Sequence, residues 1–125
     1  MPDRCPFCEP DSERIWMENA IGLVLWDAFP VTEGHTLVVP RKHVASIYEL
    51  SPDERAALWT LVGEARQQLQ DQLHPDGFNV GVNDGQAAGQ TVPHAHIHVI
   101  PRRTGDVADP RGGIRWMIPD KARYW

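Results

Sequence analysis

The segment HAHIHVI, residues 94–100, restricts the fold of this chain more than any other stretch. Its histidines alternate with apolar residues, and successive side chains of a β-strand point to opposite faces of the sheet. As a strand it would carry three imidazoles on one face, about 7 Å apart, since each residue adds ~3.3 Å. Its other face would carry Ala95, Ile97 and Val99, which need an apolar partner. The chain must therefore provide a second element that covers this apolar face.

A long amphipathic helix is predicted for that role. The sequence SPDE is a typical helix start, because Ser51 can accept from the amide of Glu54 while the Glu54 side chain closes a capping box. Pro52 suits the first helical position, and the turn HPDG further on is a typical helix end. The sequence therefore predicts one helix over residues 52–73. A stripe at helical spacing carries its apolar residues: Ala57, Leu58, Leu61, Val62, Ala65 and Leu69.

Short apolar runs predict four further strands, at residues 15–18, 21–26, 35–40 and 78–83. Pro40 and Pro101 are expected to end the strands that they follow, since proline lacks the amide that a ladder needs. A glycine-bearing loop, DGQAAGQ at residues 84–90, joins the last two strands. The chain is thus expected to combine a small sheet with a single helix.

Length and charge narrow the classes of function. At 125 residues the chain has room for one domain with a core, and not for two. A net charge of −5 argues against a dedicated nucleic-acid-binding protein, whose affinity depends on lysines and arginines. No apolar run approaches the roughly 20 residues of a membrane-spanning helix, and the polar amino terminus lacks the apolar region of a signal peptide. We therefore expect a cytoplasmic protein that binds neither membranes nor nucleic acids.

The two cysteines, Cys5 and Cys8, form a single C-x-x-C pair near the amino terminus. In a reducing compartment such a pair is more often half of a metal site or a redox pair than a structural disulfide. The pair taken alone leaves the metal and the redox interpretations open.

Three histidines in strict alternation favour a chemical function over a chance placement of core or surface histidines. Two kinds of chemistry suit them. Alternating histidines can supply ligands to a catalytic metal ion, as in some zinc enzymes. They can also supply a nucleophile, because a neutral imidazole, with an unperturbed pKa of ~6.5, is a good nucleophile near neutral pH.

These residues also resemble a known family. HAHIHVI fits the His-x-His-x-His-φ-φ signature, where φ is apolar, of the histidine triad (HIT) family of nucleotide hydrolases and transferases. The similarity extends to the GQTV segment before the triad, the DGQAAGQ loop, the upstream D-x-x-P-x-x-x-G-H-T-L-V-V-P and the PRKH after it, and it covers most of residues 5–103. It implies an α+β, HIT-like fold, with an antiparallel sheet of about five strands and one long helix. It also implies a homodimer that extends the sheet.

The chain continues beyond the segment that resembles the family. We expect residues 1–125 to form a single HIT domain, with a core at 5–103 and a C-terminal tail at 104–125. The tail has no clear period and carries the large aromatics Trp116, Tyr124 and Trp125. In the family this segment can lie near the partner's active site and influence substrate choice. Here it could instead cover apolar surface at a dimer interface.

The resemblance implies catalytic roles for three histidines. His96, the middle residue of the triad, resembles the family's nucleophile, which attacks the α-phosphorus of a nucleotide and forms a covalent nucleotidyl-histidine intermediate. His98 resembles the residue that contacts the phosphate and the leaving group. His35 resembles a fourth histidine that packs behind the triad and tunes it. A core histidine with satisfied hydrogen bonds is the competing interpretation of His35.

A second set of residues resembles the family's substrate contacts. Asn83, Gly89 and Thr91 resemble phosphate contacts, and a glycine lets the backbone approach the phosphate closely. Gln90, beside Thr91, is a further candidate substrate contact, although in a strand it would face away from Thr91. Asp27 resembles the acceptor for ribose hydroxyls, with a local turn bond as the alternative.

The base pocket of the family corresponds here to Phe7, Leu25 and Trp26. By strand alternation Leu25 shares a face with Asp27, whereas Trp26 opposes them. We therefore expect Phe7 and Leu25 to line the base pocket.

The C-x-x-C pair has a counterpart in the family as well. Some members hold zinc with such a pair, a histidine in P-x-x-H and the first histidine of the triad. The residues at those positions here are Cys5, Cys8, His43 and His94. The resemblance therefore implies a structural zinc site, since four protein ligands leave no open coordination position. Two unligated thiols and an exposed His43 are the alternative.

Together these features predict a nucleotide hydrolase or transferase that cleaves at the α-phosphate of a purine nucleoside conjugate. Dinucleoside polyphosphates, nucleoside phosphoramidates and other adenylylated small molecules are the implied substrates. The chemistry requires no cofactor, although a divalent ion could neutralise a polyphosphate substrate. A catalytically weak nucleotide-binding regulatory protein that acts through partners is the alternative function.

Overall fold

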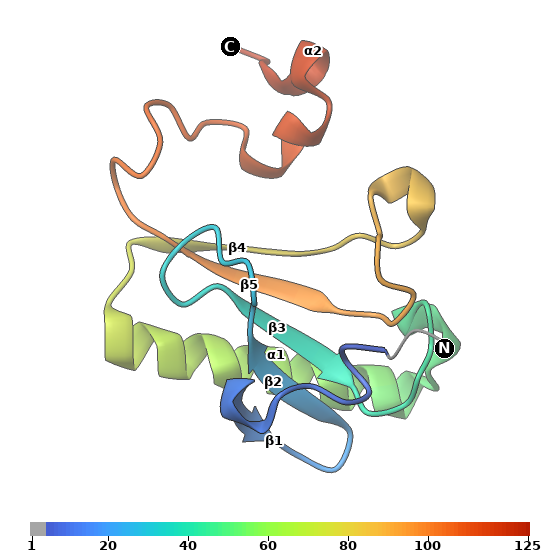
Figure 1. Cartoon of the computed structure of the whole chain (residues 1–125). Coiled ribbons are helices and arrows are strands. Elements are labelled where there is room, and N and C mark those ends of the chain that lie inside the picture. The colour runs from blue at the N-terminus through green and yellow to red at the C-terminus, as the bar shows by residue number, and fades with distance from the viewer. Residues whose placement is uncertain (1–4) are drawn as a thin grey trace.

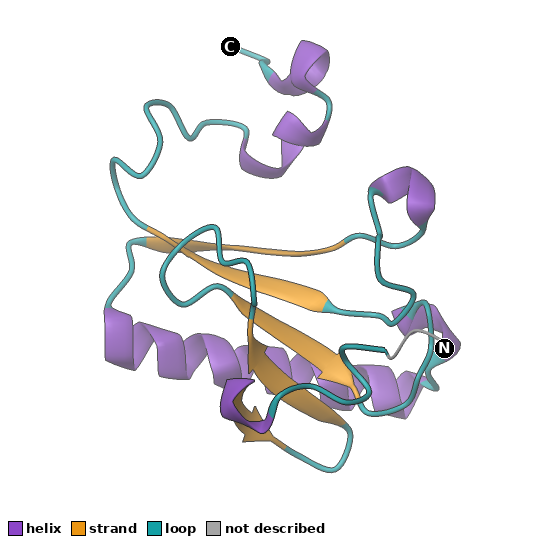
Figure 2. Cartoon of the chain, in the orientation of Figure 1, coloured by secondary structure: helices purple, strands orange, loops and turns teal. Residues whose placement is uncertain are grey.

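A five-stranded antiparallel sheet with one long helix on one face forms the body of the protein (Figures 1 and 2). The computed structural model describes residues 5–125. Its main elements are β1 Ile15–Glu18, β2 Gly22–Trp26, β3 Thr36–Pro40, α1 Pro52–Leu73, β4 Gly77–Val82 and β5 Ile97–Arg102. Neighbouring strands lie in the order β1-β2-β3-β5-β4, and every pair is antiparallel. The predicted α+β fold is confirmed.

Helix α1 begins and ends where the sequence predicts. Ser51 Oγ accepts from the amide of Glu54 at 3.1 Å, and the Glu54 carboxylate accepts from the amide of Ser51 at 2.8 Å, which is the predicted capping box. His74 ends the helix in a left-handed conformation with φ of 49°. The face turned to the sheet buries Leu58, Leu61, Val62, Ala65 and Leu69. Burying each leucine contributes about 1.5–3 kcal/mol of hydrophobic free energy.

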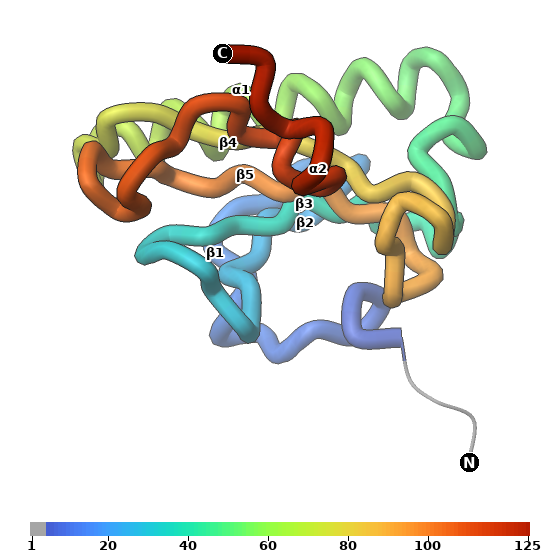
Figure 3. Tube along the Cα trace, turned by 90° about the horizontal axis from the view of Figure 1, so that it is seen from above, coloured from blue at the N-terminus to red at the C-terminus, as the bar shows by residue number. Residues whose placement is uncertain are grey.

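The apolar face of the histidine segment meets this helix. Ala95, Ile97 and Val99 are all buried in the core cluster that contains the helix residues, together with Val24 and Val38 of the neighbouring strands. The opposite face of the sheet carries the amino-terminal segment. Figure 3 shows α1 on one side of the strands and the chain before β1 on the other. The imidazoles of the triad are therefore left on the side away from α1.

The last strand, β5, begins three residues later than predicted. His94 and His96 lie before the hydrogen-bonded part of β5. The amide of Ala95, between them, donates to the carbonyl of Val44 at 2.7 Å, and Val44 lies in a loop and not in a strand. The alternation is nevertheless kept. Phe7 contacts the rings of His94 and His96, while Ala95 packs on the helix side.

The predicted end of this strand before Pro101 is wrong. β5 continues to Arg102, and Pro101 pairs with Phe78 of β4. β3 pairs with β5 only as far as Val99, so beyond that residue β5 has a strand neighbour on one side alone. A proline is tolerated there because one side of the strand needs no amide donors.

The carboxyl-terminal residues form short helices beside the β4 edge of the sheet (Figure 1). A 3-10 helix at Gly113–Met117 is followed by α2 at Pro119–Ala122. The guanidinium of Arg115 stacks over the ring of Tyr124 at 5.0 Å, so part of the tail's charge is used within the tail. Among residues 5–125, no helix has the length and apolar character that a bilayer crossing requires.

Candidate functional site

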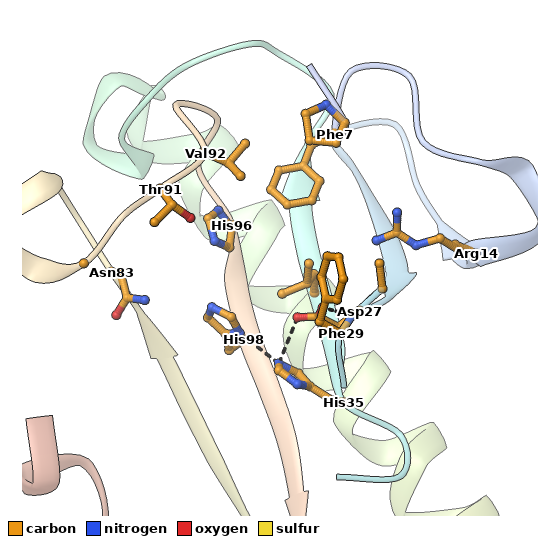
Figure 4. A pocket seen from close by; sticks show the side chains of 14 residues that line it. Phe7, Arg14, Asp27, Phe29, His35, Asn83, Thr91, Val92, His96 and His98 are labelled. Carbon is orange, nitrogen blue, oxygen red and sulfur yellow. Dashed lines mark hydrogen bonds and ion pairs between the residues drawn. The ribbon is translucent and has the colours of Figure 1, made fainter. Parts of the chain in front are cut away.

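A cavity of about 430 Å³ opens on the face of the sheet away from α1 (Figure 4). His96 and His98 line it, together with His35 from the loop before β3. The other lining residues come from segments far apart in the sequence: Pro6, Phe7, Arg14, Asp27, Ala28, Phe29, Leu37, Asn83, Gly89, Thr91 and Val92. The fold thus brings most of the predicted nucleotide contacts to one cavity.

His96 presents an unprotonated ring nitrogen to this cavity. Its Nδ1 lies 2.9 Å from the backbone carbonyl of His94, and because a carbonyl can only accept, Nδ1 carries the proton. The neutral ring therefore keeps its lone pair on Nε2. The residue is 8% exposed and packs against Phe7, with 5.0 Å between ring centroids. A ring held in one tautomer and shielded from bulk water is suited to act as a nucleophile.

His35 and His98 are joined by a hydrogen bond of 2.9 Å between Nε2 and Nδ1 (Figure 4). The backbone amide of Val31 donates to Nδ1 of His35 at 3.1 Å, so the proton of neutral His35 stands on Nε2. His35 is therefore the donor to His98, and the proton of His98 stands on its own Nε2. His98 can offer this N–H to a ligand in the cavity.

Burial keeps these imidazoles uncharged. Burial, followed by the nearby rings of His96 and His35, lowers the pKa of His98 to about 4. Burial also lowers the pKa of His35, against a smaller opposing effect of the Asp27 carboxylate. The same desolvation lowers the pKa of His94. His35 and His98 therefore form a chain of neutral hydrogen-bond donors at neutral pH.

Asp27 uses its carboxylate in two contacts. Oδ1 accepts from the amide of Phe29 at 2.8 Å, and Oδ2 lies 3.3 Å from Nε2 of His35. The local turn bond, which is the alternative to a ribose contact, is therefore present. Because each carboxylate oxygen has a further lone pair and Asp27 lines the cavity, it can still accept from a ligand.

The loop between β4 and β5 brings the predicted phosphate contacts to the cavity wall. Asn83, Gly89 and Thr91 all line the cavity, and Figure 4 shows Asn83 and Thr91 on the side of the two triad histidines. Gly89 adopts φ of 98°, and no atom lies within 4 Å of the place where a Cβ would stand. Backbone conformation, and not crowding, is the reason for a glycine here.

Gln90 holds this loop and does not line the cavity. Its side-chain oxygen accepts from the amide of Gly85 at 2.8 Å, and its nitrogen donates to the carbonyls of Ala45 at 2.8 Å and Val92 at 3.0 Å. The amide group is thus engaged with three backbone groups. The structure does not support the predicted substrate contact at Gln90, because the side chain serves to shape the loop.

The apolar wall differs from the prediction at one position. Phe7 lines the cavity as predicted. Leu25 is fully buried and does not line it. Leu37 of β3, which pairs with Leu25, lines the cavity instead. Alternation placed Leu25 on the correct side of the sheet, where neighbouring residues cover it. Trp26 lies on the other side, as expected, and stacks on Trp16 with 4.8 Å between centroids.

The four predicted metal ligands come together beside this cavity. Ligand atoms of Cys5, Cys8, His43 and His94 all lie within 4.8 Å of one another. Three sulfur-to-nitrogen separations in this cluster, Cys5–His94, Cys8–His43 and Cys8–His94, run from 3.2 to 3.5 Å, and the two Nδ1 atoms are 3.1 Å apart. Zn–S bonds of ~2.3 Å and Zn–N bonds of ~2.0–2.1 Å imply tetrahedron edges of roughly 3.3–3.8 Å, so the cluster fits such an ion after a small expansion.

His94 is oriented for this cluster. Its Nε2 donates to the backbone carbonyl of Pro40 at 2.8 Å, so its unprotonated Nδ1 faces the sulfur of Cys5 at 3.3 Å. A hydrogen bond on the far ring nitrogen is the usual support of a metal-ligating histidine. The geometry therefore favours a metal site over two unligated thiols.

The three alternating histidines do not converge on one point. His94 belongs to the cysteine cluster, whereas His98 groups with Asp27 and His35, whose ligand atoms also lie within 4.8 Å of one another. Within residues 5–125, no group of potential metal ligands contains His96. In the group of Asp27, His35 and His98, Nδ1 of His35 accepts from a backbone amide, so Nε2 of His35 carries the proton. This Nε2–H donates to Nδ1 of His98, so neither of these two nitrogens is free to bind a metal ion. The interpretation as a catalytic metal site on the triad has no geometric support.

Arg14 also lines the cavity, although no motif in the sequence indicates it. It ends the 3-10 helix Ser12–Arg14, and its Nε donates to the carbonyl of Trp26 at 2.9 Å. It is the one arginine or lysine that lines the cavity in the described part of the chain. No local pattern marks it, because its position depends on the path of the chain before β1 across the sheet.

Comparison with known proteins gives consistent matches. Residues 11–105 match the model of the HIT domain family. The chain is 32% identical over 110 residues to the bis(5'-nucleosyl)-tetraphosphatase (asymmetrical) of Schizosaccharomyces pombe, a match that covers 87% of this chain and 60% of that protein. It is 42% identical over 85 residues to an uncharacterised 16.1 kDa HIT-like protein of Mycoplasma pneumoniae, covering 68% and 59%. The chain therefore spans about three fifths of the length of these two relatives.

A solved structure with the same fold is that of a Zn-bound histidine triad family protein from Mycobacterium smegmatis. It is 37% identical to this chain, with a TM-score of 0.74, and the match covers 84% of this chain and 79% of that one.

Proposed function

Because the chain belongs to the HIT domain family, we propose that it is a nucleotide hydrolase or transferase that cleaves its substrate at the α-phosphate. The substrate is a purine nucleoside conjugate, such as a dinucleoside polyphosphate, a nucleoside phosphoramidate or another adenylylated small molecule. The observation that carries this proposal is the bond from Nδ1–H of His96 to the carbonyl of His94, which leaves Nε2 as a nucleophile at the cavity. The relative named as a bis(5'-nucleosyl)-tetraphosphatase supports a nucleotide substrate.

In the first step, Nε2 of His96 attacks the α-phosphorus, so a phosphorus–nitrogen bond forms and the bond to the leaving group breaks. The ring then carries a positive charge, which the carbonyl of His94 stabilises through Nδ1–H. Nε2–H of His98 donates to the phosphoryl oxygen or the leaving atom, where negative charge develops. The leaving group departs with the electron pair of the broken bond and takes up a proton from solvent. In the second step the oxygen of water attacks the phosphorus, the phosphorus–nitrogen bond breaks, and its electron pair returns to Nε2 of His96. The hydroxyl stays on the nucleotide, and the other proton of the water is released to solvent, which balances the proton taken up by the leaving group.

The rest of the cavity holds the nucleotide in place. Asp27 accepts from ribose hydroxyls, and Phe7 and Leu37 contact the base. Asn83 and Thr91 donate to phosphate oxygens, while Gly89 lets the backbone come close. Positioning of this kind supplies much of the catalysis of phosphoryl transfer.

A second cavity gives the leaving group room. It has a volume of about 300 Å³ and shares His35, Asn83 and His98 with the first. Its remaining wall comes from Val31 in the loop before β3, from β4 and β5, and from Ile114 and Met117 of the tail. A substrate that spans both cavities places its scissile bond at the histidines that lie between them.

The cysteine cluster is the second part of the proposal. Cys5, Cys8, His43 and His94 bind a structural zinc ion, as the fit of the ligand atoms and the zinc-bound M. smegmatis relative support. With four protein ligands the ion has no open position, so it adds stability and not chemistry. Through His94 it also steadies the carbonyl that orients His96. The reaction needs no further cofactor, apart from a divalent ion that accompanies a polyphosphate substrate.

The protein acts as a homodimer, formed through α1 and a neighbouring strand so that the sheet is extended. β4 is an edge strand of the sheet, and Trp59 on α1 is 42% exposed. An edge strand and an exposed aromatic favour association with a second chain. Light scattering should give twice the chain mass of 14.1 kDa, and a single chain mass would contradict the dimer. A cytoplasmic location remains a prediction from the sequence.

The reaction is tested with adenosine 5'-phosphoramidate, diadenosine tetraphosphate and other adenylylated compounds, followed by phosphorus NMR with and without chelator. His96→Ala should lower hydrolysis ~10³-fold or more while AMP still binds. His74→Asn is the control, because His74 is exposed and lies outside the cavity. Asparagine tolerates the left-handed conformation at this position, so the variant should keep full activity. A nucleotidyl adduct on His96, found by mass spectrometry, would identify the intermediate.

Two outcomes would contradict this function. Hydrolysis retained in His96→Ala would rule out the nucleophile. A wild-type protein that binds AMP and cleaves none of the compounds would favour the regulatory nucleotide-binding protein instead.

A further inference from the structure

Arg14 stands in a part of the cavity that the proposed reaction leaves unused. Figure 4 shows its guanidinium directed toward the space between Phe7 and Phe29. Its Nε is held by the carbonyl of Trp26 at 2.9 Å. Within residues 5–125 no carboxylate pairs with it, so both terminal NH₂ groups are available to a ligand.

The other contacts indicate which part of a nucleotide reaches Arg14. The α-phosphate must lie at His96, on the side of the cavity where Asn83 stands (Figure 4). Asp27 is the carboxylate on the wall, and it suits the ribose. Arg14 and the apolar groups around it lie away from Asn83, on the far side of the cavity. The base, and not the phosphate chain, therefore extends toward Arg14.

A guanidinium at the edge of a base distinguishes the two purines. Its two parallel N–H donors match two neighbouring acceptors, and guanine presents N7 and O6 side by side. Adenine presents N7 beside the amino donor at N6, so one N–H of the fork would meet another donor. Apolar wall residues such as Phe7 and Leu37 contact both bases alike. Arg14 is thus the group in this wall that can discriminate between them.

On the basis of the function proposed above, we propose that Arg14 determines base specificity and makes the protein prefer 6-oxopurine nucleotides, those of guanine and hypoxanthine, over adenine nucleotides. The bond from Nε to Trp26 holds the guanidinium in one orientation before the ligand arrives. A preorganised fork loses little side-chain freedom on binding. The resulting preference is about tenfold or greater.

Titration calorimetry with four nucleotides tests whether the protein recognises the N7 and O6 edge of the purine base. GMP and IMP, which share N7 and O6, should bind about tenfold more tightly than AMP. The 7-deaza analogue of GMP, which lacks N7, should lose most of this advantage. Equal or tighter binding of AMP by the wild-type protein overturns the proposal without any substitution.

Three variants test the residue itself. Arg14→Met keeps the length of the side chain without its donors, and Arg14→Lys keeps the charge without the fork. Arg14→Met should bring the GMP-to-AMP affinity ratio close to one, whereas Arg14→Lys, which still offers a donor to O6 and N7, should keep only part of the preference. Arg41→Met is the matched control, because Arg41 also donates from Nε to a backbone carbonyl, that of Asn19 at 3.0 Å, but outside the cavity. It should keep the wild-type ratio.

The outcomes separate this inference from the proposed function. A GMP preference that persists in Arg14→Met overturns the role of Arg14. Nucleotide binding with no preference between GMP and AMP does the same, while it leaves the hydrolase proposal intact. A wild-type protein that binds none of the nucleotides defeats both proposals.

Discussion

The backbone carbonyl of His94 accepts Nδ1–H of His96 at 2.9 Å, so the residue that faces the cysteine cluster also orients the residue that faces the cavity. The ring of His94 is held on both sides, by the carbonyl of Pro40 and by the sulfur of Cys5. The two sites of the protein are therefore mechanically linked, and a disturbance of the cluster should reach the cavity.

Loss of a cluster ligand should lower stability strongly and activity moderately. Cys8→Ser removes one of the four proposed zinc ligands, so zinc content should fall from the expected one ion per chain. The melting temperature should drop by roughly 5 °C or more, because an ion bound only by the folded state stabilises that state. Plasma mass spectrometry and thermal unfolding measure both effects. Ser12→Ala, in the same segment, is the control. A zinc-free wild-type protein of unchanged stability would contradict the structural role.

Mild acid should destabilise the protein through its buried histidines. Burial lowers the pKa of His98 to about 4, below the value of 6.5 for an unperturbed histidine. Between these two values the unfolded chain binds a proton that the folded ring does not, so the free energy of unfolding falls as the pH falls through this window. His35 contributes in the same direction. We expect a loss of roughly 1–2 kcal/mol from His98 between about pH 7 and pH 5.

Urea unfolding at several pH values in this window measures the effect in the wild type and in His98→Asn. The difference between the two proteins removes contributions from carboxylates and from the metal ligands, which both proteins share. His98→Asn should show the shallower pH dependence, and parallel curves would count against a neutral, buried His98.

His35 should act on the turnover step more than on binding. It fixes the proton of His98 through the bond of 2.9 Å, so His35→Phe leaves His98 free to change tautomer. We expect kcat to fall about tenfold or more with little change in KM. His35→Gln should recover part of the loss, because its amide can donate to the same nitrogen. The opposite pattern, with KM raised and kcat unchanged in His35→Phe, would show that His35 serves only to fill space.

Gln90 should matter for the shape of the loop. Gln90→Ala removes bonds to the backbone of Gly85, Ala45 and Val92 and should lower stability by about 1–2 kcal/mol. KM should rise because the loop carries the proposed phosphate contacts Gly89 and Thr91. Gln86→Ala, an exposed glutamine in the same loop, is the matched control and should have little effect. Thermal unfolding with substrate kinetics decides the matter, and equal behaviour of the two variants would refute the loop-holding role.

Features that depend on neighbours along the chain could be predicted from the sequence. Helix α1 has its predicted bounds because its cap and its apolar stripe are local patterns. The alternation of the histidine segment is likewise local, and its two faces are confirmed. The start of β5 was not predictable, since it depends on a bond from Ala95 to Val44, which lies in a distant loop.

The residues of the cavity show the same difference between features set by local patterns and features set by contacts between distant segments. Strand alternation predicted the face of the sheet on which Leu25 lies. It could not predict that Leu37, which pairs with Leu25 in the sheet, would line the cavity in its place. The role of Gln90 in the loop and the place of Arg14 in the cavity could not be predicted, for a related reason. The carbonyls that hold their side chains belong to other segments of the chain, and no spacing in the sequence records such contacts.

Local patterns were enough to predict the helix, the two-faced histidine segment and the residues that resemble a nucleotide site and a metal site. The positions of the imidazole protons follow from the folded arrangement: on Nδ1 of His96, on Nε2 of His35 and on Nε2 of His98. Periodicity acts between near neighbours, whereas a tautomer is set by whichever hydrogen-bonding group folding brings to the ring. The bond from His94 to Pro40, which joins residues 54 positions apart, is a contact of this kind.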